Sequence, residues 1–292
     1  MNRTYYKAIW ILVALISTST SLFAQSKNDS TSSSINYAEN TFLTSRVING
    51  QSSDCLPQKQ LALRVEHRFG LLNSGFSQFY GLDQATTFFD LEYGITDWLM
   101  AGLNRTSTDK TVSGFAKLGL FKQSTGTRNM PFSVALMFQA SVIGTKYTDP
   151  ARNNDFNSRL NYLYQVIIAR KFSDHLSAQV APALIHRNIV PSSVTDKNDL
   201  LTLGIGAKYK LTPILSLSGE YYPVISPSEY FKNNYSNSLS FSLDIETAGH
   251  IFQLILSNSA DMLEKNFVGE TRGSWLKGDV HFGFNILRKF DL

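Results

Sequence analysis

Hydrophobic and polar residues alternate one by one through most of the chain beyond residue 60. In Phe132–Val142, apolar side chains at every second position alternate with Ser, Ala, Met and Gln. The same period of two recurs at 61–69, 201–211, 239–246 and 280–286. This is the period of a β-strand whose two faces meet different surroundings. The pattern therefore predicts an all-β protein.

Twelve such segments of about ten residues are predicted, and this is the length that a tilted strand needs to cross the hydrocarbon layer. They cover residues 61–69, 85–95, 98–106, 113–122, 131–142, 160–171, 176–187, 200–211, 214–222, 238–246, 250–258 and 278–289. Because every backbone N–H in lipid must be paired, a spanning sheet has to close on itself. The apolar face, with Leu63, Val134 and Phe282, then points to lipid, and the polar face lines the interior.

The connections between these strands alternate between long and short. Most of the long ones are polar, whereas Thr96-Asp97 and Thr212-Pro213 are tight turns; residues 123–130 are the exception. Long external loops and short periplasmic turns on an even number of strands are typical of an outer-membrane barrel. The sequence thus predicts an antiparallel transmembrane β-barrel of about 12 strands at residues 59–292.

Residues 1–24 are predicted to be a signal peptide that directs export through the inner membrane. Arg3 and Lys7 precede the apolar stretch Ala8–Ile16, which is too short to span a bilayer. Small and hydroxyl residues follow, and cleavage is expected after Ala24. No stretch of 18 apolar residues follows the signal, so transmembrane helices are not expected.

Residues 25–58 are predicted to form a periplasmic lead-in to the barrel, in which residues 41–50 are a candidate for one short strand. The first part is rich in Ser, Asn, Asp and Thr, which is typical of a flexible segment. The alternation at 41–50 is poor, so three roles stay open for it: a plug, a clasp on the barrel, or an extra strand. Cys55, the single cysteine, can form no internal disulfide and fits no haem or zinc spacing.

The net charge gives no indication of a particular partner. Removal of Arg3 and Lys7 takes the formal charge of +4 to +2, and no basic cluster suited to nucleic acid is present. The partners expected from the fold are outer-membrane lipid and the machinery that assembles barrels.

Four segments carry a resemblance to a known family. They are Glu66–Gly70, Gly81–Trp98, Gly114–Leu118 and Asn129–Val134. Together they resemble an uncharacterised β-barrel family that is common in Bacteroidota, and the likeness covers most of the mature chain. The resemblance implies a barrel in the outer membrane and brings no catalytic residues with it.

Charged residues of both signs share the interior face of the predicted strands. The predicted lumen-lining set is Arg64, Glu66, Arg68, Asp90, Glu92, Lys117, Lys208, Lys210, Glu220, Asp244, Glu246 and Asp279. A Lys or Arg facing lipid near the midplane would cost about 2–4 kcal/mol. The charges either line a narrow aqueous pore or pair across strands and fill the lumen as a polar core. The mixed signs argue against a strongly ion-selective channel, and a plugged or gated pore is expected as readily as an open one.

No residues form a convincing catalytic or metal site. A lipid hydrolase would need a Ser, a His and a carboxylate or amide at the outer rim, and His67 is the best-placed histidine. No serine stands out beside it, and the five histidines lack metal-ligand spacing. The oxygen-rich loop Asp149–Asp155 does not fit an EF-hand. We therefore expect no catalysis, no cofactor and no bound metal.

Three functions remain as hypotheses. The first is a passive small-solute channel or a structural envelope barrel. The second is a barrel enzyme that acts on lipid at the outer rim. The third is a binding barrel whose long loops, above all 143–159 and 223–237, engage a partner or a hydrophobic ligand.

Overall fold

The structure, a computed structural model, describes residues 34–147, 154–190 and 195–292. The predicted signal peptide and most of the loop Asp149–Asp155 lie outside the described residues. Within the described residues, no helix is both long and apolar enough to cross a bilayer.

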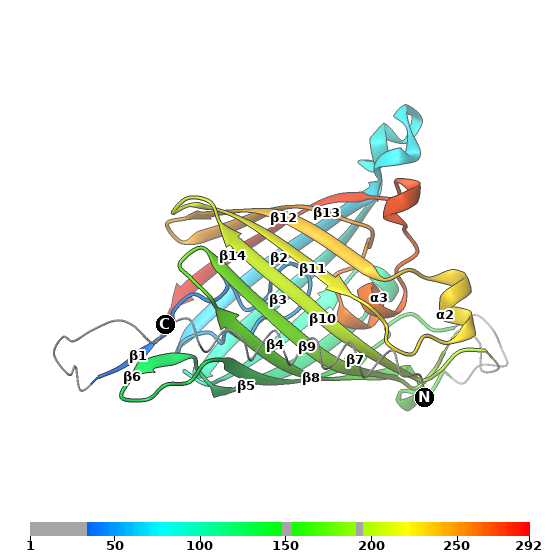
Figure 1. Ribbon diagram of the computed structural model, residues 1–292. Coiled ribbons are helices and arrows are strands. Elements are labelled where there is room, and N and C mark those ends of the chain that lie inside the picture. Colours follow the sequence, from blue (N-terminus) through cyan, green and yellow to red (C-terminus); the bar gives the residue numbers. More distant parts are fainter. Residues whose placement is uncertain (1–33, 148–153, 191–194) are drawn as a thin grey trace, which may run out of the picture. The chain divides into compact units, whose positions relative to one another are not determined.

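Twelve antiparallel strands close into a barrel (Figure 1). The strands are β2 (Gln60–Leu71), β3 (Ala85–Thr96), β4 (Leu99–Thr106), β5 (Val112–Phe121), β7 (Ser133–Val142), β8 (Leu160–Lys171), β9 (Leu176–Arg187), β10 (Asp199–Lys210), β11 (Leu215–Tyr222), β12 (Ser238–Thr247), β13 (His250–Ser257) and β14 (His281–Asp291). Each pairs with its neighbour in the chain, and β14 pairs with β2 to close the wall. The predicted fold class is confirmed.

The two rims of the barrel differ in the length of their connections. Five connections lie at the short-turn end, and residues 97–98 and 248–249 are among the tightest. Six longer ones lie at the long-loop end, and they include residues 72–84 and 258–280. The long connection at the short-turn end, residues 122–132, contains β6 (Ser124–Gly126), which pairs with β1 (Ile35–Tyr37).

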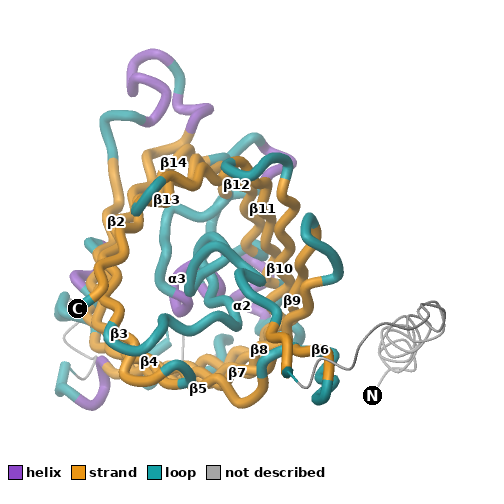
Figure 2. Tube along the Cα trace, turned by 90° about the vertical axis from the view of Figure 1, so that its left-hand side faces the viewer, coloured by secondary structure: helices purple, strands orange, loops and turns teal. Residues whose placement is uncertain are grey.

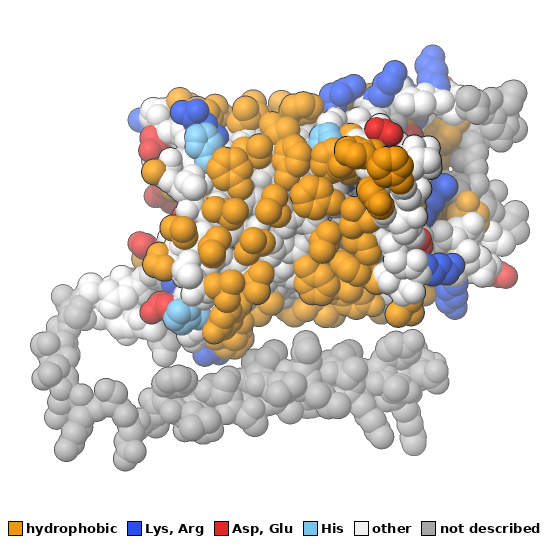
Figure 3. Space-filling model, turned by 90° about the horizontal axis from the view of Figure 1, so that it is seen from above, with side chains coloured by type: hydrophobic (Ala, Val, Ile, Leu, Met, Phe, Trp, Pro, Cys, Tyr) orange, Lys and Arg blue, Asp and Glu red, His pale blue; other side chains and the backbone are white. Residues whose placement is uncertain are grey.

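The outer face of the wall is apolar. Leu103 is 65% exposed and Phe89 is 49% exposed, whereas their neighbours Asn104 and Asp90 are buried. Figure 3 shows hydrophobic side chains over the middle of the face in view, with charged side chains toward its two ends. This is the arrangement that a spanning barrel needs, with apolar residues on the lipid side of every strand.

Two segments that are not part of the wall lie inside the barrel. The segment before β2 runs through the lumen, and the connection between β13 and β14 folds inward with its helix α3 (Glu264–Gly269), as the end-on view in Figure 2 shows. Every residue of α3 is buried. By contrast, α2 (Glu229–Asn234) lies in the β11–β12 connection and buries only Phe231.

Candidate functional site: the filled lumen

A short hairpin enters the lumen from the short-turn end and fills its middle. Residues 41–54, here called the plug hairpin, are closed by an antiparallel bridge between Arg46 and Gln51 and by a 2.8 Å bond from the N–H of Val47 to the carbonyl of Gly50. Every residue from Thr44 to Ser53 is buried. Of the three roles that the sequence left open for residues 41–50, this arrangement is that of a plug. Residues 41–53 thus lie within the barrel rather than ahead of it.

Arg46 is the charged anchor of the plug hairpin. Its Nε lies 3.1 Å from Asp90 Oδ2 on β3, and its Nη1 lies 2.9 Å from Glu264 Oε1 on α3. The guanidinium also lies 5.2 Å from the ring centroid of Phe88. Burial alone would lower the pKa of Arg46, but the carboxylates of Glu264 and Asp90 raise it above its ordinary value. Arg46 is therefore charged, and it joins the hairpin both to the wall and to the loop that folds in from the opposite end.

Glu220 on β11 holds the tip of the hairpin. Its carboxylate accepts hydrogen bonds from three successive backbone N–H groups, those of Ile48, Asn49 and Gly50, at 3.3, 2.9 and 3.1 Å. Successive N–H groups that converge in this way form an anion-binding nest. Gly50 allows the tip of the hairpin to lie this close to β11, because a Cβ at this position would lie 1.5 Å from the hydroxyl of Tyr222 at the end of that strand.

We expect Glu220→Gln to loosen the plug hairpin, because the new amide N–H₂ cannot accept a bond and the charge that favours the nest is lost. Hydrogen bonds to charged groups contribute about 1.5–3 kcal/mol, and each 1.4 kcal/mol is about tenfold in population. The rate at which maleimide alkylates Cys55, at the foot of the hairpin, should rise about tenfold or more. Glu246→Gln is the matched control, because Glu246 is only half-buried and lies near the short turn that follows β12. Equal rates in the two variants would contradict the anchoring role of Glu220.

Cys55 suits this measurement because it is the only cysteine and is partly buried. Burial raises the pKa of its thiol, although Lys117 acts in the opposite direction. Thiolate is the reactive form, so the seated hairpin keeps the thiol slow to react. Release of the hairpin would expose the thiol and bring its pKa back toward the ordinary value.

Lys117 on β5 binds the two arms of the hairpin together. Its Nζ donates to the carbonyl oxygens of Ser45, Ser52 and Asp54 at 2.8, 3.1 and 3.0 Å. Wall amides bind the remaining carbonyls of the tip: Gln179 donates to Gln51, Gln253 to Val47 and Asn285 to Ile48. The wall is thus complementary to the backbone of the hairpin.

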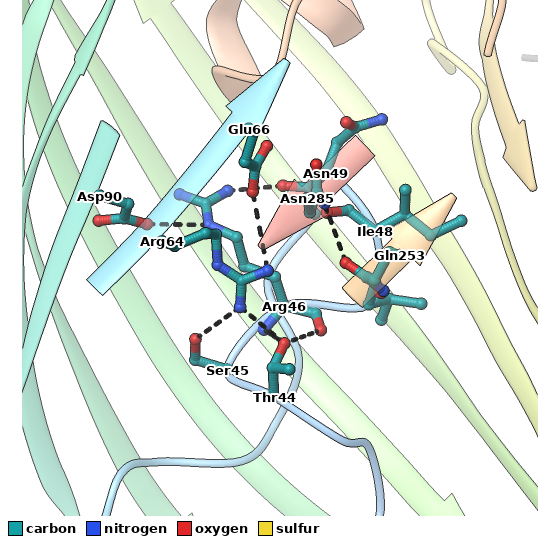
Figure 4. A network of polar contacts seen from close by, with 12 residues as sticks. Thr44, Ser45, Arg46, Ile48, Asn49, Arg64, Glu66, Asp90, Gln253 and Asn285 are labelled. Atoms are coloured by element: carbon teal, nitrogen blue, oxygen red, sulfur yellow. Dashed lines mark hydrogen bonds and ion pairs between the residues drawn. The ribbon is translucent and has the colours of Figure 1, made fainter. Parts of the chain in front are cut away.

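Two basic side chains of β2 also bind the hairpin, and Figure 4 shows the first of them, Arg64. Arg64 donates to Thr44 Oγ1 at 2.7 Å, and Arg68 donates to Asn49 Oδ1 at 2.7 Å. Glu66 lies between them, 3.7 Å from Arg64 and 3.9 Å from Arg68. Its two oxygens have no hydrogen-bond partner among the described residues, so the attraction in this trio is mainly that of charge.

An apolar stopper closes the lumen toward the long-loop end. We call residues 259–272, which include α3, the stopper loop. Phe267 packs edge-on against Tyr222 at 5.0 Å between ring centroids, and Met262 and Leu263 pack with Phe88. All of these side chains are buried. The lumen therefore holds a hairpin that is bound mainly by polar contacts and a loop that packs through Met262, Leu263 and Phe267, and the two are linked by the ion pair of Arg46 with Glu264.

Nine of the twelve residues predicted to line the lumen are buried in the wall. They are Arg64, Glu66, Arg68, Asp90, Glu92, Lys117, Lys208, Glu220 and Asp244. Lys210 and Glu246 lie near the short turns and are half-buried. Asp279 does not line the lumen: it precedes β14, which begins at His281, and it accepts a hydrogen bond from Asn73 in the neighbouring loop. The predicted last strand, 278–289, started too early.

The partners of these charges differ from those expected. Glu220 does not face Lys208 or Lys210 on the neighbouring strand: the register places it opposite Gly206, and its bonds go to the hairpin. Arg64 lies opposite Asp90 on the neighbouring strand, yet the ion-pair partner of Asp90 is Arg46. Sequence reasoning missed Arg46 and Glu264 because neither lies on a strand. The only available signal was the broken alternation at residues 41–50.

The geometry does not support a lipid-hydrolysing site at His67. This side chain is stacked on Phe284 at 5.2 Å between ring centroids, and its Nδ1 has no hydrogen-bond partner within the described residues. Over all the residues that the structure describes, no three His, Cys, Asp or Glu side chains come together closely enough to hold a metal ion.

Comparison with known families gives one match that covers most of the chain. The model described as "Membrane bound beta barrel domain (DUF5777)" matches residues 42–290. The matched region begins inside the plug hairpin, so it includes both the hairpin and the wall. A comparison with curated proteins finds no match.

Several solved barrels are similar in fold. The NanC porin is 11% identical, with a TM-score of 0.48, over 80% of this chain and 100% of its own. An outer membrane channel from Pseudomonas putida F1 is 12% identical, with a TM-score of 0.48, over 82% of this chain and 98% of its own. The KdgM porin is 10% identical, with a TM-score of 0.44, over 79% of this chain and 99% of its own. At such identities and TM-scores, these neighbours say nothing about the solute or the gating of this chain.

Proposed function

Since the chain belongs to the family of membrane-bound β-barrel domains (DUF5777), we propose that it is an outer-membrane barrel that conducts small solutes passively. In the present conformation the channel is closed by the plug hairpin and the stopper loop. The short-turn end faces the periplasm and the long-loop end faces the outside, as in other barrels of this class.

The observation that carries this proposal is that the polar wall is bound to a segment that is not part of the wall. Lys117 and Glu220 each make three bonds to the hairpin, and Gln179 and Gln253 add others. A barrel that only needed a permanent core could fill it more stably with apolar side chains. A wall lined with Ser, Gln and charged residues can instead be hydrated when the hairpin leaves.

The charges of the wall favour a channel with little selectivity between small anions and cations. The buried bases of the wall strands are Arg64, Arg68, Lys117, Arg187 and Lys208, and the buried acids are Glu66, Asp90, Glu92, Glu220 and Asp244. Five positive and five negative groups cancel. Twelve strands lie between the barrels that side chains fill, at about eight, and open porins, at about sixteen. Such a lumen suits small solutes.

A disulfide between the hairpin and the wall should hold the channel shut. A Cβ added at Gly206 on β10 would lie 3.2 Å from Val47 Cγ2, which is where the sulfur of a cysteine at position 47 can lie. We expect Val47→Cys/Gly206→Cys, in a Cys55→Ser background, to show no openings in planar bilayers when oxidised and to show openings again after reduction. Each single cysteine variant is the control and should not respond to reductant.

The same recordings distinguish the alternatives. Conductance that is identical in the oxidised and reduced forms would mean that solute does not pass the hairpin. A structural envelope barrel is the second candidate, and the tight apolar packing of Phe267 against Tyr222 favours it. It would be left as the function if no conductance arose even after the lumen was emptied.

We propose that residues 1–24 direct export, that the barrel-assembly machinery inserts the chain, and that its source belongs to the Bacteroidota. The first of these is tested by the mass of the mature protein, which should correspond to cleavage after Ala24.

A further inference from the structure

The β2–β3 connection presents aromatic side chains to the surroundings at the long-loop end. Phe76 is 78% exposed, Phe79 54% and Tyr80 52%. Beside it, in the β13–β14 connection, Leu276 is fully exposed. We call these four residues the rim knob. Large apolar side chains gathered at one exposed place indicate an interaction surface, since single exposed residues are common but clusters are not.

The two loops that carry the rim knob, the β2–β3 and β13–β14 connections, are hydrogen-bonded to each other. The N–H of Leu72 donates to the carbonyl of Val280 at 2.8 Å, and Asn73 Nδ2 donates to Asp279 Oδ1 at 3.0 Å. The backbone of the first loop is also fixed in an unusual form. Phe79 and Tyr80 have φ values of 44° and 53°, a left-handed conformation that non-glycine residues seldom adopt. The N–H of Tyr80 donates to the carbonyl of Gly75 at 2.9 Å and helps to keep this form. Such a conformation persists only where the surroundings hold it, so the outward presentation of the two rings is built in.

The position of the knob indicates what it touches. In Figure 1 the β2–β3 connection, in cyan, stands at the long-loop end, and in the end-on view of Figure 2 it lies outside the ring of strands next to β14 and β2. The loop therefore extends outward from the barrel axis, toward the region in which lipid surrounds the barrel. A loop engaged in closing the lumen would lie inside this ring.

The knob also continues the lipid-facing surface of the wall. Directly before it, Phe69 on β2 stacks on Phe282 of β14 at 5.9 Å between ring centroids. On its other side, Trp275 packs edge-on against Phe241 of β12, whose side chain is 50% exposed on the outer face. Aromatic side chains at the membrane surface are typical of the boundary between acyl chains and headgroups.

We propose that the rim knob inserts into the outer lipid leaflet and anchors the long-loop rim of the barrel to it. This inference rests on the proposed membrane barrel but not on its conducting solutes. The contact is mainly apolar, because the charge of exposed Lys277 is balanced by that of exposed Asp83 in the β2–β3 connection. The ligand is therefore the acyl-chain boundary of the leaflet rather than one particular headgroup.

The test uses single cysteines that carry a bimane fluorophore in a Cys55→Ser background, reconstituted in phosphatidylcholine–phosphatidylglycerol vesicles. We expect lipid with a nitroxide near its headgroup to quench the label at Phe76→Cys and Leu276→Cys to about the same fraction as at Leu103→Cys on the outer wall. Iodide in the buffer should quench neither of the two knob labels appreciably. Lys197→Cys, in another exposed loop at the same end, is the matched control and should show the reverse.

Each outcome decides the proposal. Quenching of the two knob labels by iodide, as at position 197, overturns the anchor. Shielding from both quenchers indicates a second copy of the chain or another protein on the knob, and it also overturns the anchor. If Leu103→Cys is not quenched by lipid, the membrane barrel itself is refuted. Failure of the barrel can therefore be distinguished from failure of the anchor alone.

Discussion

Emptying the lumen of both segments that fill it should convert the barrel into a steadily open pore. The variant replaces residues 42–54 and residues 260–272 with short Gly/Ser linkers. Both excisions are feasible, because the ends of each segment lie close together. The N–H of Phe42 donates to Asp54 Oδ2 at 2.8 Å, and Asn258 Nδ2 donates to the carbonyl of Gly273 at 2.9 Å.

Neither replacement alone should give the full effect. Without the hairpin, the stopper loop still packs Phe267 against Tyr222 and Leu200. Without the stopper loop, Lys117 and Glu220 still hold the hairpin. We therefore expect small and unsteady conductance from each single replacement, and a conductance in the double replacement that exceeds the sum of the two.

The measurement combines planar-bilayer recordings with swelling of liposomes in sugars of increasing size. Heat-modifiable migration on a gel is the control that the wall has folded. A folded double variant that conducts nothing would refute the channel and leave the structural barrel. A single replacement that already gives the full conductance would show that one segment alone closes the lumen.

The wall of the barrel could be predicted from the sequence almost residue by residue. The alternation of apolar and polar positions is imposed on each strand separately by lipid on one side and lumen on the other, so it is visible locally. Strands such as β8 and β9 begin and end where the pattern predicts. The early start assigned to β14 has a physical reason, since the register shifts between His281 and Gly283 and the pairing ends there.

The contents of the lumen could be predicted much less well. The plug hairpin has the periodicity of neither strand nor helix, and its stability comes from bonds to residues far away in the sequence, such as Glu220, 171 positions from Asn49. The stopper loop is similarly hidden, because Glu264 and Lys265 give its short helix a polar sequence although it is buried. The charged residues of the wall could be identified in the sequence. The two arrangements predicted for them, pore lining and cross-strand pairing, did not include the plug hairpin, which binds most of these charges.

Arg46→Ala should release the plug hairpin more than any other single substitution. Asp90 and Glu264 would be left buried without the cation that lies 3.1 and 2.9 Å from them. Removal of one partner from a buried ion pair costs about 3–5 kcal/mol. Each 1.4 kcal/mol is about tenfold in population, so the unseated fraction should rise by about two to three and a half orders of magnitude. Alkylation of Cys55 and the frequency of channel openings should rise together.

Two further variants separate charge from packing. Arg46→Lys keeps the charge but lacks the planar fork that reaches Asp90 and Glu264 together, so we expect an intermediate release. The triple variant Arg46→Met/Asp90→Asn/Glu264→Gln removes the cation and both uncompensated carboxylates, and it should return the alkylation rate toward that of wild type. If the triple variant releases the hairpin as strongly as Arg46→Ala, the arginine acts by its shape and not by its charge. The ion pair that joins the two ends of the lumen would then not be what keeps it closed.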